Sequence, residues 1–129
     1  MAKLRDLVDV NINRDVIKIQ GVEFPVIFTF ESFPYLQEAY GKSYAEFEKD
    51  LNSMLSSGEV TVGEKETKIM SALIYAMIRS GGTEATFDEV KGAIPLHDLV
   101  EIFKVIMPIF NRQMFQAEDS KKIKAEKKS

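Results

Sequence analysis

The sequence predicts an α+β domain in which a two-stranded antiparallel β-hairpin, or a three-stranded meander, precedes about five helices. Apolar residues alternate with polar ones over residues 1–30, as in half-buried strands. Over residues 31–116 they recur at helical spacing. We therefore expect a single domain over residues 1–116, β-rich over 1–30 and helical over 31–116. The charged residues 117–129 are expected to form a disordered tail.

The clearest strand signal is "VIKIQGVEFPVIFTF", residues 16–30. Ile17 and Ile19 alternate with polar residues, and a second alternation begins after "GVE". This pattern predicts two strands joined by a short turn that contains glycine. Pro25 has no amide proton, so it should lie on an edge strand or point its nitrogen outward. A third strand over "VDVNI", residues 8–12, is also plausible, and the apolar face of the second strand should carry Phe24, Val26, Phe28 and Phe30.

The helix boundaries are marked by local signals. Ser or Thr precedes Glu by three residues at Ser43…Glu46, Thr61…Glu64 and Thr86…Glu89, which is the capping-box pattern of a helix start. Glycine follows the expected helix ends at Gly41, Gly58 and Gly81-Gly82. Pro95 is placed to open the last helix. These signals predict helices over about residues 32–40, 44–57, 63–80, 87–93 and 95–116.

Two of these helices are unusually apolar. In "KIMSALIYAMI", residues 68–78, only Ser71 interrupts the apolar surface after Lys68, so this helix should be central to the core. The last helix carries two apolar stripes that together cover about 220°, whereas roughly 100° or more is usual for a surface helix. The first stripe is expected to face the core and contains Leu96, Leu99, Val100, Phe103, Ile106, Met107, Phe110 and Met114.

The second stripe of the last helix consists of Ile102, Val105 and Ile109. If this stripe were exposed, the fold would forgo about 1.5–3 kcal/mol of favourable burial free energy for each of its side chains. Another helix of the same domain, another subunit or a client protein could cover it. We expect a partner-binding surface formed by Ile102, Val105, Ile109, Met114 and Phe115.

The composition argues against several classes of function. The net charge of −3 provides no general attraction to nucleic acid or to anionic membranes. Cysteine is absent, which excludes disulfides and thiolate chemistry. The N-terminus does not read as a signal peptide, and the longest apolar run, residues 72–78, is far shorter than the ~20 residues of a membrane helix. A cytoplasmic protein without membrane association is expected.

No catalytic, cofactor-binding or metal-binding residues are predicted. His97 is the only histidine, and Asp98 could orient it as a base. No nucleophile or second base is marked nearby, so His97 is expected to be an ordinary residue in the first turn of the last helix. Glu46, Glu48 and Asp50 are expected to form a solvated helix face. The protein is therefore expected not to be an enzyme.

One segment has a familiar order of elements. Residues 17–51 read "IKIQGVEFPVIFTFESFPYLQEAYGKSYAEFEKDL": a hairpin, a small helix that ends in "YGKS", and a capped helix that begins "SYAEFE". An apolar central helix and a last apolar helix follow over residues 61–115. This order resembles the tail assembly chaperones of long-tailed bacteriophages and prophages of Gram-positive hosts. The family has no catalytic motif, so no site residues transfer.

The resemblance implies a non-enzymatic protein in the cytoplasm of the infected or lysogenic bacterial host. It implies binding to the tape measure protein during tail morphogenesis, homo-oligomers, and a longer frameshifted product of the same reading frame. Two alternatives remain open. The first is a structural tail or head–tail connector subunit retained in the virion, and the second is a small nucleic-acid-associated regulator with a Lys-rich tail.

Overall fold

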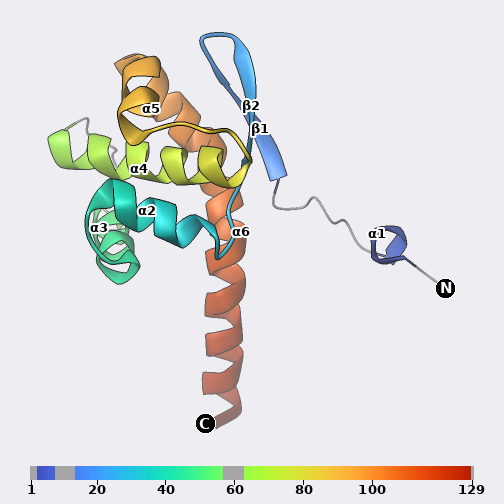
Figure 1. Cartoon of the computed structure of the whole chain (residues 1–129). Helices are drawn as coiled ribbons and strands as arrows, with labels where there is room; N and C mark the ends of the chain where they lie inside the picture. Colours follow the sequence, from blue (N-terminus) through green and yellow to red (C-terminus); the bar gives the residue numbers. More distant parts are fainter. Residues whose placement is uncertain (1–2, 8–13, 57–62, 129) are drawn as a thin grey trace.

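The computed structural model describes the backbone of residues 3–7, 14–56 and 63–128, and the side chains of residues 3–7, 15–56 and 63–112. A hairpin packs against a group of helices, and the last helix extends well beyond them (Figure 1). This arrangement confirms the expected α+β class; the possible third strand at residues 8–12 lies outside the described residues. The elements are α1 Leu4–Leu7, β1 Arg14–Ile19, β2 Val22–Ile27, α2 Ser32–Tyr40, α3 Tyr44–Ser56, α4 Glu64–Ser80, α5 Phe87–Ala93 and α6 Leu96–Lys128.

The hairpin is closed by a two-residue turn. Ile19 pairs with Val22, so the turn is Gln20-Gly21, with φ of 52° and 79°. Two positive φ values in succession are typical of the type I′ turn, whose twist matches that of the strands. The expected short turn that contains glycine is therefore confirmed, and the second strand begins directly after it, because Val22 and Glu23 already pair with β1. The Gln20 side chain also donates a hydrogen bond of 2.8 Å to the carbonyl oxygen of Ala93 at the end of α5.

Pro25 lies where a missing amide proton is tolerated. It is paired with Val16. In a hairpin, the pair of residues that flanks a two-residue turn exchanges backbone hydrogen bonds, and pairs without and with such bonds alternate from there. Val16 and Pro25 form the third pair after the flanking one, so they exchange no hydrogen bonds. The Pro25 nitrogen consequently faces away from β1, as an edge position requires.

Helix α4 is the centre of the core, as its apolar sequence predicts. Every residue from Ile69 to Ile78 is buried, and α4 contacts β2, α2, α3, α5 and α6. Its last residue, Ser80, bonds through its hydroxyl to the buried Ser32 hydroxyl at 2.6 Å, which joins α4 to the start of α2. The next residue, Gly81, lies against β2: a Cβ atom there would collide with the Pro25 carbonyl oxygen and lie 2.7 Å from its carbonyl carbon.

The helix starts follow the expected signals in part. Thr86 and Glu89 form a complete capping box at the start of α5, with backbone-to-side-chain bonds of 3.1 and 2.8 Å. At the start of α3, the Ser43 hydroxyl accepts a hydrogen bond of 3.3 Å from the Glu46 amide. Thr61 lies outside the described residues, and α4 begins after Gly63.

The core face of α6 is rotated from the expected one. Leu96, expected in the core stripe, is 59% exposed, whereas Ile102 and Ile109 of the second stripe are buried. At about 100° per residue, the centre of the buried face is displaced by about 60° toward the second stripe. Because α6 contacts both α4 and β1, these two neighbours decide which side of a broadly apolar helix is covered. Among the α6 residues whose side chains the structure describes, the buried ones are Leu99, Ile102, Phe103, Ile106, Ile109 and Phe110.

Helix α6 does not end near Gln116. Its backbone continues as a helix to Lys128, beyond the expected helix end. These residues are mostly alanine, glutamate and lysine, which are strong helix formers. Acidic residues also precede lysines by three or four positions, as at Glu118 and Lys122, a spacing that supports a helix.

Candidate interaction surface

The five residues expected to bind a partner do not form one exposed surface. Ile102 and Ile109 are covered by the rest of their own domain, so their assignment to an accessible stripe is wrong. Val105 is 46% exposed. Met114 and Phe115 lie in the backbone of α6, beyond the residues whose side chains the structure describes. Of the expected surface, Val105 is the residue that the structure places in solvent.

A different apolar surface lies between β2 and α2. Phe30 is 86% exposed, and its ring packs edge-on against the half-buried Phe33 with centroids 5.8 Å apart. Phe33 stacks in turn on Tyr44 of α3, at 4.1 Å and an interplanar angle of 12°. We call Phe30, Phe33 and Tyr44 the aromatic surface.

The turn that carries Phe30 is held by four hydrogen bonds. The Ser32 amide donates to the Thr29 carbonyl at 2.9 Å, and the Phe33 amide donates to the Phe30 carbonyl at 3.2 Å. The Thr29 amide donates to the Ser32 hydroxyl at 3.0 Å, and the Glu31 amide donates to the Thr29 hydroxyl at 3.2 Å. Phe30 is therefore presented to solvent by an ordered turn.

The aromatic surface is continuous with the core beneath α6. Phe33 packs on the buried Phe28 at 5.8 Å, and Phe28 meets Phe110 of α6 edge-on at 4.9 Å. Sequence reasoning placed Phe30 on the apolar strand face together with Phe28. Because β2 ends at Ile27, Phe30 belongs to the turn instead, and the predicted helix start near Ser32 was the signal that could have shown this.

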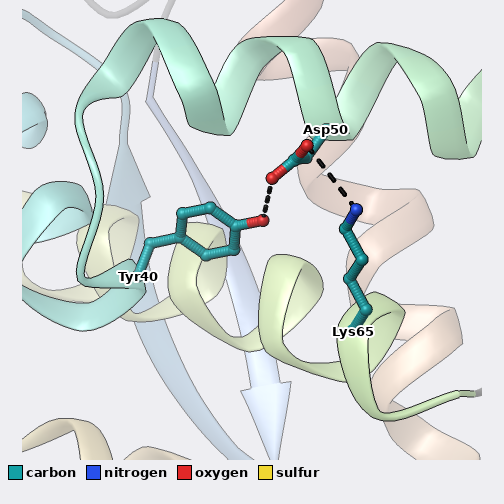
Figure 2. A network of polar contacts seen from close by, with 3 residues as sticks. All are labelled: Tyr40, Asp50 and Lys65. Atoms are coloured by element: carbon teal, nitrogen blue, oxygen red, sulfur yellow. Dashed lines mark hydrogen bonds and ion pairs between the residues drawn. The ribbon is translucent and has the colours of Figure 1, made fainter.

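A polar cluster joins α2, α3 and α4 on another part of the molecule (Figure 2). The Tyr40 hydroxyl donates a hydrogen bond to Asp50, and the Lys65 Nζ lies 3.6 Å from the other Asp50 oxygen. Burial and the hydrogen bond to Asp50 raise the pKa of Tyr40, whereas the hydrogen bond from Tyr40 holds the pKa of Asp50 below its ordinary value. Asp50 was expected on a solvated helix face. It instead links three helices through its contacts with Tyr40 and Lys65.

This cluster predicts a pH-dependent effect of Tyr40→Phe. A carboxyl group whose pKa is lower in the folded chain stabilises the fold above its unfolded pKa, which is about 4 for aspartate. That contribution is lost as the pH falls through the lower folded value. Tyr40→Phe should therefore destabilise the protein most at neutral pH and progressively less below about pH 4. Urea unfolding at several pH values measures this, and in an Asp50→Asn background the effect of Tyr40→Phe should no longer depend on pH.

The remaining titratable groups do not assemble a metal-binding site among the described residues. His97 is exposed in the first turn of α6, with its Nε2 3.3 Å from the Asp98 carboxylate. In the described part of the chain, no three acidic or histidine side chains converge as metal ligands would. None of the helices described there has the length and apolarity needed to cross a bilayer.

The fold and these surfaces define a small α+β protein with an exposed aromatic surface and a long projecting helix. In comparisons with models of known protein families, with curated proteins and with solved structures, the chain has no match.

Proposed function

We propose that this protein is a tail assembly chaperone of a long-tailed phage or prophage. It would act without catalysis in the cytoplasm of the bacterial host, where it binds the tape measure protein through apolar surface. The resemblance over residues 17–51 supports the proposal, as does the order of hairpin, central helix and last apolar helix. The observation that carries the binding role is the exposed Phe30 on its hydrogen-bonded turn.

The mechanism that we propose is shielding. Burying a phenylalanine side chain is favourable by about 1.5–3 kcal/mol of free energy. A partner that covers the exposed Phe30 gains this free energy. Because the turn is already ordered, little conformational entropy is lost on binding. Apolar faces of client helices would pack on the aromatic surface, with Val105 as a second contact, until the tail tube polymerises around the client.

Phe30→Ser tests the proposal. We expect the variant to bind the tape measure protein at least about tenfold more weakly, since aromatic anchors dominate many interfaces. Its unfolding midpoint should stay close to that of the parent, because Phe30 is not part of the core. Co-expression and co-purification, followed by calorimetric titration, measure binding. Leu4→Ser is the matched control, since Leu4 is also an exposed apolar residue but lies in α1.

Unchanged binding by Phe30→Ser would exclude the aromatic surface as the client site. The class of function has its own test, because a chaperone should be absent from purified virions. Its detection there by mass spectrometry would favour a structural tail or connector subunit. The nucleotide sequence around codons 118–129 tests for a slippery run and a longer frameshifted product.

A further inference from the structure

A second apolar feature lies at the tip of the hairpin. It is a hollow of about 170 Å³, enough for one aliphatic side chain. Its apolar walls come from the hairpin, the end of α4, the α4–α5 connection and α5, in the form of Ile19, Phe24, Ile78, Ala85, Val90 and Ala93. We call it the hairpin hollow. The Gln20 bond to Ala93 holds the hairpin against α5 beside it, so the hollow is a built part of the fold.

The polar groups of the hairpin hollow are mostly acidic. Glu84 and Glu89 line it together with Thr83, and the described lining residues include no lysine or arginine. Glu89 is engaged by the Thr86 amide in the capping box, which leaves the exposed Glu84 as the more available carboxylate. An apolar hollow with acidic groups fits an apolar side chain that has cationic neighbours.

The last turns of α6 carry that combination. Residues 117–129 contain one apolar residue larger than alanine, Ile123, within "KKIK". Lys121, Lys122 and Lys124 surround it in sequence. The segment holds five lysines and three acidic residues, so it is basic in a chain whose net charge is −3.

Ile123 cannot reach the hollow of its own chain while α6 remains helical. Ala93 lines the hollow and lies just before α6, which starts at Leu96. At 1.5 Å per residue, Ile123 lies about 40 Å farther along the helix axis. The later part of α6 also points away from the hairpin tip (Figure 1). An Ile123 side chain that fills the hollow must therefore come from another copy.

We propose that α6 of one copy docks Ile123 into the hairpin hollow of a second copy, with its neighbouring lysines facing Glu84. The two sides of this contact are different surfaces at opposite ends of α6. Two copies can exchange the contact reciprocally about a two-fold axis and close as a dimer, or the contact can propagate head to tail into rings or filaments. This inference concerns self-association alone and does not depend on the identity of the client.

Ile123→Asp tests the α6 side of the contact. We expect the full-length protein to show concentration-dependent self-association in sedimentation velocity. Ile123→Asp should weaken this association at least about tenfold, and the conservative Ile123→Leu should retain it. A parent protein that stays monomeric at millimolar concentration, or an Ile123→Asp variant that associates like the parent, would overturn the proposal.

Cross-linking tests both sides together, because the chain has no native cysteine. Glu84→Cys and Lys124→Cys are prepared separately, mixed and oxidised. We expect a disulfide-linked heterodimer to form in the mixture at least about tenfold faster than when Lys42→Cys replaces Glu84→Cys, since Lys42 lies away from the hollow in the connection between α2 and α3. Equal rates with both partners would contradict docking in the hollow. Because the readout is self-association, its failure would leave the proposed client binding untouched.

Discussion

Replacing Gly81 with alanine should lower the free energy of unfolding by about 3 kcal/mol, the upper end of the usual cost of overpacking. The added methyl group would collide with the backbone of Pro25, and neither the end of α4 nor β2 can move without disturbing the core. Gly81 has a φ of −74°, so the effect arises from close packing and not from backbone strain. Urea unfolding followed by circular dichroism measures it.

Gly92→Ala is the matched control for that variant. Gly92 lies inside α5, and a Cβ atom there meets nothing within 4 Å. Alanine in a helix interior is more favourable than glycine by about 0.5–1 kcal/mol, so this variant should be slightly more stable than the parent. Equal stability of Gly81→Ala and Gly92→Ala would contradict the close approach of α4 to β2.

Ile109→Ala is the second change with a large expected effect. Ile109 is fully buried, and loss of its side chain should lower the free energy of unfolding by about 2–5 kcal/mol. Val105→Ala, one turn earlier on the same helix, should change stability by about 0.5 kcal/mol or less. Thermal and urea unfolding of both variants measure the difference.

This pair separates the two positions that the sequence placed in one stripe. If Ile109 were free to bind a partner, its truncation would leave the stability of the isolated protein nearly unchanged. A stable Ile109→Ala variant would therefore contradict the observed core face of α6.

The strands and helices could be predicted largely from local sequence, because their signals act over a few residues. The alternation at Ile17 and Ile19 predicts β1, and the unbroken apolar surface of residues 69–78 predicts a buried helix. The expected turn that contains glycine is present at Gln20-Gly21, although glutamine is uncommon at positive φ. The Tyr40–Asp50–Lys65 cluster joins residues from three elements, and no local spacing announces it.

The larger error was the expected core-facing side of α6, and it arose because the apolar surface of this helix is broad. When apolar residues cover about 220° of a helix, periodicity leaves the core direction open over a wide range. The neighbours that decide it, α4 and β1, meet α6 only after the chain has folded. The candidate site differs from the expected one for a related reason. Phe30 is exposed because β2 ends before it, and sequence patterns locate such a boundary only to within a few residues.

The dependence of the hairpin on distant partners has a consequence during synthesis. A two-stranded hairpin is at best marginally stable alone, and the groups that secure this one, Gly81 and Ala93, follow it by more than fifty residues. Ribosomes add about 5–20 residues per second, so the nascent hairpin leaves the ribosome several seconds before α4 and α5 can cover it. Its apolar strands are then exposed during synthesis, so we expect the yield of folded protein to rise when general chaperones are co-expressed.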